Sequence, residues 1–99
     1  MATLHVLSHS PFADTRLASC LRLLGNDDGV LLCGDATYAL MPSSAPFLAV
    51  QHLFGSSQLF VLDEDIKARN LPLPAGANGI DYPAFVALSL RFDKVNTWL

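Results

Sequence analysis

Two cysteines are the most reactive side chains in the sequence, and Cys33 has the more suggestive surroundings. It follows the unbroken apolar run Val30-Leu31-Leu32 and precedes Gly34-Asp35. Such a run is typical of a parallel strand buried on both faces, and functional groups gather beyond the carboxyl ends of parallel strands. Amides near a strand end would lower the pKa of a thiol. Cys33 is therefore a candidate nucleophile by placement, with simple packing as the alternative.

Cys20 has a different setting, in an apolar stripe with helical spacing. The stripe predicts an amphipathic helix that buries Ala13, Leu17, Cys20, Leu21 and Leu24. A thiol buried among such residues has a raised pKa and behaves as a small hydrophobic side chain. Position alone therefore favours a packing role for Cys20. The two cysteines form no CxxC motif and are expected to be free thiols.

The residue types also raise the possibility of a serine hydrolase. The run Ser8-His9-Ser10 could supply a nucleophile and a base, and Asp14 or Asp35 could supply the orienting carboxylate. However, the sequence has no GxSxG nucleophile elbow. Ser10 followed by Pro11 is typical of a helix N-cap. We therefore interpret these serines as turn and cap residues.

The sequence predicts no metal site. The histidines His5, His9 and His52 share no ligand spacing. The acidic run Asp63-Glu64-Asp65 lacks the glycine and the distal glutamate of a calcium-binding loop. Acidic residues of this kind complement the dipole at the start of a helix. We therefore expect neither a metal nor another cofactor.

The composition favours a small subunit of a larger assembly. The 99 residues suffice for one domain, residues 1–99, and 52% of them are hydrophobic. Part of this apolar content is expected to face a partner. The net charge is −3 without a basic stripe, which argues against direct nucleic-acid binding. The sequence shows neither an apolar run long enough for a membrane span nor a signal-peptide pattern, so we expect a cytoplasmic protein.

The elements that must position these side chains form an α/β pattern. Strands are predicted at Thr3–Leu7, Val30–Leu32, Gln58–Leu62 and Ile80–Asp81. Helices are predicted from Pro11 to Leu24, from Ala36 to Leu40, from Phe47 to Phe54, from Asp63 to Arg69 and from Tyr82 to Phe92. The segment 93–99 is assigned no element. We predict a three-layer α/β fold with a mostly parallel sheet of four or five strands and helices on both faces.

Taken in order, several short motifs give the chain a family resemblance. They are Leu4-His5 with Leu7-Ser8 and Ser10-Pro11-Phe12, Cys20-Leu21-Arg22-Leu23-Leu24 with Leu31-Leu32, Asp35 with Tyr38, Leu62-Asp63-Glu64-Asp65 with Ala68-Arg69, Ile80-Asp81-Tyr82 with Phe85-Val86, and Val95 with Trp98-Leu99. Together they resemble the TusB/DsrH family of sulfur-relay subunits over essentially the whole chain.

This resemblance implies a DsrE-like fold and a heterohexamer with TusC/DsrF-like and TusD/DsrE-like subunits. In the Tus branch, persulfide sulfur passes through such a complex to a TusE/DsrC-like acceptor, toward 2-thiolation of the tRNA wobble uridine. In the Dsr branch, related complexes serve sulfur oxidation. The main sulfur-accepting cysteine of the Tus branch belongs to the TusD-like partner.

For this chain, the resemblance implies a subunit of a persulfide-transfer complex, with tRNA thiolation as the favoured branch. Cys20 is similar to the first-helix cysteine of DsrH-type subunits and is the first candidate for direct transfer. Cys33 departs from the family, which commonly reads Leu-Leu-Gln-Asp-Gly there, and is the second candidate. The alternatives are a DsrH-type subunit in sulfur oxidation, a purely structural subunit and a homo-oligomeric binding module.

Overall fold

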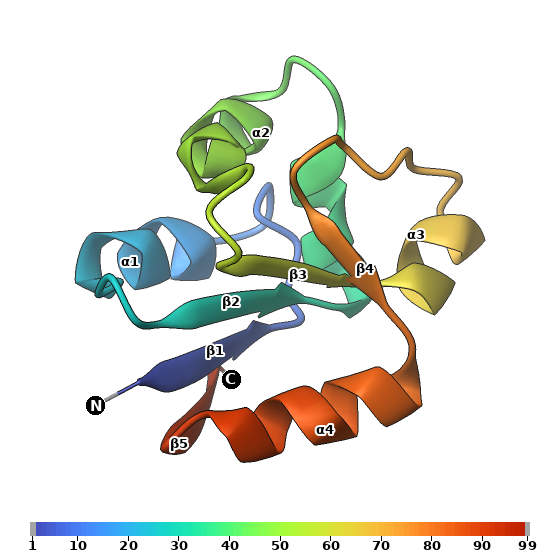
Figure 1. Cartoon of the computed structure of the whole chain (residues 1–99). Helices are drawn as coiled ribbons and strands as arrows, with labels where there is room; N and C mark the ends of the chain where they lie inside the picture. Colours follow the sequence, from blue (N-terminus) through green and yellow to red (C-terminus); the bar gives the residue numbers. More distant parts are fainter. Residues whose placement is uncertain (1, 99) are drawn as a thin grey trace.

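Five parallel strands form a single sheet in the computed structural model, which describes residues 2–98 (Figure 1). The strands are β1 (Thr3–Leu7), β2 (Gly29–Leu32), β3 (Leu59–Leu62), β4 (Asn78–Ile80) and β5 (Lys94–Trp98). Their order across the sheet is β4-β3-β2-β1-β5, and every neighbouring pair runs parallel. The predicted sheet is confirmed, and it is parallel throughout.

Helices cover the two faces of the sheet unequally. The α-helices are α1 (Arg16–Leu23), α2 (Ala45–Val50), α3 (Asp63–Ala68) and α4 (Tyr82–Arg91), and the 3₁₀ helices are η1 (Gly34–Leu40) and η2 (Gln51–Leu53). Figure 1 shows α1 and α2 on one face of the sheet and α4 on the opposite face. These three layers confirm the predicted α/β architecture. None of the helices within residues 2–98 has the length and apolar character that a membrane crossing requires.

Each face of the sheet has its own core. The larger core lies on the face of α1 and contains Leu7, Leu17, Cys20, Val30, Leu32, Ala36, Ala39, Leu40, Val50, Leu53, Leu59, Val61 and Ile66. The smaller core lies on the face of α4 and contains Leu4, Val6, Leu31, Phe60 and Leu88. Successive residues of a strand point to opposite faces, so a strand between two cores needs apolar residues throughout. β2 meets this requirement as the middle strand, and all four of its residues are buried.

The predicted start of the first helix is wrong. α1 begins at Arg16, and Ser10 instead forms a turn in which its hydroxyl accepts a hydrogen bond from the amide of Phe12 at 3.2 Å. The carbonyl of Ser10 accepts a further bond from the amide of Ala13 at 3.1 Å. These local bonds compete with a helical start, as serine often does. Ala13 therefore lies outside the helix and is exposed, unlike Leu17.

The last strand, β5, was not predicted from the sequence. It pairs with β1 in the register Leu4↔Val95 and Leu7↔Trp98. Four of its five residues are exposed, because β5 is an edge strand and only Trp98 packs against the larger core. It therefore lacks the buried apolar pattern by which strands are recognised. The predicted terminal segment also includes Leu99, which lies outside the described residues.

Two further boundaries differ because a side chain caps a helix. The Ser44 hydroxyl accepts the amide of Phe47 at 3.2 Å, so α2 starts before the predicted segment 47–54, whose remainder forms η2. Asp81 was predicted at the end of a strand. Its carboxylate accepts the amide of Ala84 at 2.8 Å instead, and it caps the start of α4.

Candidate functional site

Cys33 lies directly beyond β2, at the carboxyl edge of the sheet where the sequence predicts a site. Its amide donates to the carbonyl of Leu7 at 3.0 Å, and its thiol lies 3.5 Å from the same oxygen. The side chain is half-buried and packs against the smaller core. Gly34 then turns the chain into η1 with a φ of +53°, a conformation that glycine adopts without strain. Cys33 is thus held in place, and part of its surface remains exposed.

Helix α3 brings charged side chains to the same edge. The carboxylate of Asp65 accepts the amide of Gly34 at 2.7 Å. Arg69 donates to the Asp35 carboxylate from Nε at 3.2 Å and from Nη2 at 2.8 Å, and to the carbonyl of Asp65 from Nη1 at 3.2 Å. The guanidinium also lies over the ring of Tyr38, 5.7 Å from its centroid. One cation and two carboxylates therefore surround the backbone that follows the thiol.

The pKa of Cys33 differs from the sequence expectation. Burial raises the pKa of its thiol, the Asp65 carboxylate raises it further, and Arg69 partly opposes them. The expected lowering by nearby amides is wrong, because the Cys33 amide bonds to Leu7 and the Gly34 amide bonds to Asp65. The thiol itself donates to a carbonyl, which favours its protonated form. Cys33 is thus a protonated thiol at neutral pH in the isolated chain.

Cys20 lies on the opposite face of the sheet, in the larger core. Its side chain on α1 is fully buried, with a relative exposure of 0%. Burial, followed by the nearby Asp28 carboxylate, raises the pKa of Cys20 to about 12. The structure therefore gives Cys20 the apolar surroundings that its helical stripe predicts. Both cysteines are free thiols, which confirms that prediction.

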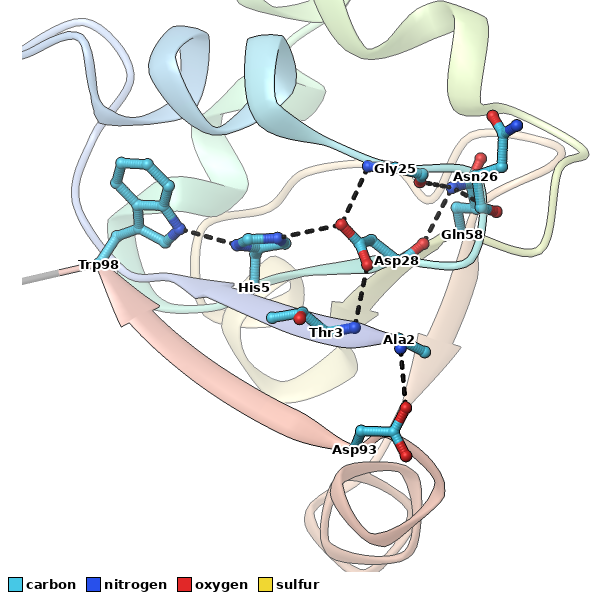
Figure 2. A network of polar contacts seen from close by, with 9 residues as sticks. All are labelled: Ala2, Thr3, His5, Gly25, Asn26, Asp28, Gln58, Asp93 and Trp98. Carbon is cyan, nitrogen blue, oxygen red and sulfur yellow. Dashed lines mark hydrogen bonds and ion pairs between the residues drawn. The ribbon is translucent and has the colours of Figure 1, made fainter.

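A second polar centre, which the sequence did not reveal, involves residues from three distant segments (Figure 2). The indole of Trp98 donates to Nδ1 of His5 at 3.1 Å. This bond places the proton of a neutral imidazole on Nε2, which faces the Asp28 carboxylate at 3.5 Å. Asp28 also accepts the amides of Thr3 and Gly25, each at 2.9 Å. Only the folded sheet brings these residues together, so no local motif could reveal them.

The network fixes the loop that precedes β2. The side-chain amide of Gln58 donates to the carbonyls of Gly25 at 3.0 Å, Asn26 at 3.2 Å and Asp28 at 2.9 Å. Burial by itself would raise the pKa of Asp28, but its two amide bonds and His5 outweigh burial and lower it. Because Asp28 precedes β2 and Cys33 follows it, the Asp28 carboxylate lies at the other end of the strand from the thiol. The centre ties this end to Trp98 on β5, which pairs with Leu7.

The hydrolase arrangement does not form. Of its two possible carboxylates, Asp14 is engaged by the amide and the guanidinium of Arg16, and Asp35 is engaged by Arg69. His9 is exposed. Within residues 2–98, no three His, Cys, Asp or Glu side chains lie close enough together to hold a metal ion. Among the candidate groups, the accessible chemistry therefore centres on the thiol of Cys33.

The fold and this thiol define a class: a small three-layer α/β protein whose parallel sheet presents a cysteine at its carboxyl edge. The family model described as "DsrH like protein" matches residues 9–95, and the chain belongs to this family. It is therefore a sulfur-relay subunit that functions in a multi-subunit complex, in accord with the resemblance read from its motifs.

A solved structure has the same fold as this chain. The crystal structure of the ychN protein from E. coli is similar with a TM-score of 0.79, covering 99% of this chain and 100% of that one. The sequence identity is 19%, so this likeness establishes the shared fold alone. No curated protein matches the chain.

Proposed function

We propose that this subunit carries sulfur as a persulfide in a complex that serves 2-thiolation of the tRNA wobble uridine. The observation that carries the proposal is the partly exposed residue Cys33 at the carboxyl edge, in a chain of the DsrH-like family. The net charge of −3 without a basic stripe favours a protein as the next sulfur acceptor rather than the RNA itself.

The chemistry is an exchange between a thiolate and a persulfide. The Cys33 thiolate attacks the terminal sulfur of the donor persulfide, and a new bond joins Sγ to that sulfur. The sulfur–sulfur bond of the donor breaks, and the donor cysteine leaves as a thiolate. The transferred sulfur keeps its proton, so Cys33 ends as a persulfide. No external oxidant or reductant is needed.

Cys20 is the other candidate for this role, on its resemblance to the first-helix cysteine of DsrH-type subunits. Its full burial and its pKa of about 12 oppose direct attack in the folded chain. Transfer to Cys20 would require α1 to open locally from the larger core. For this reason we place Cys33 before Cys20 in the proposal.

The proposed partners are TusC/DsrF-like and TusD/DsrE-like subunits in a heterohexamer, with a TusE/DsrC-like protein accepting the sulfur. The TusD-like partner supplies the main cysteine in this scheme. Cys33 then serves as an additional sulfur-carrying cysteine between the donor and the acceptor. Because the heterohexamer contains two copies of each subunit, it would contain two such cysteines.

Persulfide labelling tests the proposal directly. The isolated chain and its complex are treated with a cysteine desulfurase and free cysteine, and peptide mass spectrometry locates the added sulfur. We expect the label on Cys33, its loss in Cys33→Ser and its retention in Cys20→Ser. A label on Cys20 instead would move the role to α1, and no label on either thiol would exclude direct transfer.

The branch of the family is tested in cells. Deletion of the coding gene should remove 2-thiouridine from the wobble position, as measured by nucleoside mass spectrometry. Unchanged thiouridine together with impaired oxidation of reduced sulfur would assign the chain to the sulfur-oxidation branch.

A purely structural subunit is the second candidate function. Two observations favour it: the raised pKa of both thiols and the exposed apolar side chains along α4. A Cys20→Ser, Cys33→Ser double variant separates the two functions. Full thiolation by a complex that contains the double variant would establish the structural role.

A further inference from the structure

We propose that Asp65, on α3, and Arg69, directly after α3, are positioning residues for Cys33: Asp65 holds the backbone that carries the sulfur, and the two side chains present opposite charges to the thiol. The inference rests on the proposed role of Cys33 in sulfur transfer. It adds a way for charged side chains of the subunit to control when that thiol loses its proton and becomes a nucleophile.

The Asp65 side chain holds the backbone directly. Its Oδ2 accepts the amide of Gly34 at 2.7 Å, the donor immediately after Cys33. The preceding amide, that of Cys33 itself, bonds to the carbonyl of Leu7 at 3.0 Å. Successive peptide groups around the sulfur are therefore tied to α3 and to β1. A shift of α3 would move the sulfur with it.

Arg69 places a positive charge beside this carboxylate. Its Nη1 lies 3.8 Å from Oδ1 of Asp65 and 3.2 Å from the Asp65 carbonyl. The rest of the guanidinium is bound to Asp35, whose own side chain is 59% exposed. The side chains of Asp65 and Arg69 are only 23% and 22% exposed. Their charges are consequently less screened by solvent than that of Asp35.

The two charges act on the thiolate with opposite signs. Asp65 disfavours a negative sulfur and Arg69 favours it, in agreement with their effects on the pKa of Cys33. Neutral groups also lie beside Cys33: its thiol donates to the Leu7 carbonyl on β1, and its side chain packs against the smaller core. In the isolated chain, burial and Asp65 keep the thiol protonated. A partner that draws Asp65 away would leave Arg69 to stabilise the thiolate.

Alkylation kinetics of the full chain test the proposal, because only the thiolate reacts. Iodoacetamide labels the native protein between about pH 6 and 10, and cleavage after Arg22 puts Cys20 and Cys33 on different peptides. We expect Asp65→Asn to speed labelling of Cys33 roughly threefold and Arg69→Gln to slow it roughly threefold, each equivalent to about half a pKa unit. Asparagine retains an oxygen that can accept the Gly34 amide.

The decisive result is a labelling rate that rises in Asp65→Asn and falls in Arg69→Gln. Loosening of a merely structural ion pair would change both rates in the same direction. Glu64→Gln removes an exposed negative charge from the same helix and should leave the rate unchanged. Arg69→Lys keeps the positive charge and should label Cys33 at nearly the wild-type rate. If circular dichroism shows that Arg69→Gln does not fold, the labelling rate of Asp65→Asn is compared with that of Arg69→Lys. Faster labelling in Asp65→Asn alone would then support the inference. Rates that shift together, or not at all, would overturn the inference, whereas failure of persulfide labelling alone would overturn only the proposed function.

Discussion

At the scale of single residues, the two cysteines differ mainly in access. Cys33 is held at the end of β2 as a half-buried residue, whereas Cys20 is enclosed by the larger core. Thiol chemistry needs both a thiolate and a path for the incoming sulfur. The raised pKa disfavours the thiolate at both sites, and Cys33 differs from Cys20 in that part of its surface is exposed.

Thiol titration of the native chain should therefore find one reactive cysteine. With a pKa of about 12, the Cys20 thiolate amounts to roughly one part in ten thousand at about pH 8. We expect Ellman's reagent to modify Cys33 slowly and Cys20 only after unfolding in guanidinium. In Cys33→Ser the native protein should show no reactive thiol, and a rapid native reaction of that variant would contradict the assigned burial.

Asp28 is the residue on which the second polar centre depends. Its lowered pKa means that the unfolded chain takes up the proton first as the pH falls. Its stabilising contribution is therefore present above the ordinary aspartate pKa of about 4 and is lost as the pH falls toward the lower folded value. We expect Asp28→Asn to reduce the free energy of unfolding at neutral pH by roughly 1–3 kcal/mol and to flatten its decline in acid.

Urea unfolding followed by the fluorescence of Trp98, the single tryptophan, measures this effect. Asp27→Asn is the matched control, since Asp27 is an exposed neighbour in the same loop. Equal acid slopes for Asp28→Asn and the wild type would show that the Asp28 carboxylate contributes no pH-dependent stability.

At the scale of elements, β2 is positioned by close packing at its first residue. A Cβ on Gly29 would lie 2.7 Å from the ring of Phe92 and 3.3 Å from Leu4, both of which pack in the smaller core. A side chain there must displace the aromatic ring that follows α4. The absence of a side chain at this position therefore lets α4 and its flanking residues lie close to the sheet.

We expect Gly29→Ala to lower the free energy of unfolding by about 1–3 kcal/mol through overpacking. Gly25→Ala is the matched control, because its added Cβ would meet nothing nearer than Asp28 at 3.4 Å, an ordinary contact. Chemical denaturation measures both. Equal midpoints for the two variants would show that Phe92 moves aside at little cost.

At the scale of the whole molecule, α4 has two apolar sides. One side faces the smaller core with Leu88, which is 4% exposed. The other side carries Tyr82, Val86 and Leu90, spaced four residues apart and exposed by 49%, 60% and 81%. Residues at this spacing lie on one face of a helix. A helix that is apolar on both sides is typical of one that is buried in its working state, which fits a subunit of a multi-subunit complex.

Leu90→Lys should consequently weaken assembly while leaving the isolated subunit folded. We expect the affinity for the co-subunits to fall roughly tenfold or more, as for residues central to an interface. Analytical ultracentrifugation of the reconstituted complex measures this affinity. Leu23→Lys, at an equally apolar position that is 70% exposed on α1, is the comparison. Wild-type assembly by Leu90→Lys would exclude this side of α4 as an essential contact.

Much of the fold is predictable because β2 and the helical stripe around Leu17 carry strong local patterns. An unbroken apolar run needs cover on both faces, and a stripe at helical spacing needs cover on one. β5 carries no such pattern, because an edge strand is defined by its pairing with β1 rather than by burial. The start of α1 was also predicted wrongly. Ser10 can cap a helix or form a turn, and the local sequence permits both hydrogen-bonding patterns equally.

The sequence by itself determined the α/β class, the middle position of β2, the placement of Cys33 at a strand end and the family resemblance that the DsrH-like model confirms. These follow from residue types and from spacings along the chain. Only the tertiary structure decided the direction of the pKa shift of Cys33, the contacts of Asp65 and Arg69 near it, and the network of Trp98, His5 and Asp28. The physical reason is that electrostatic fields and hydrogen bonds depend on distances in space, and the folded sheet sets those distances between residues far apart in the chain.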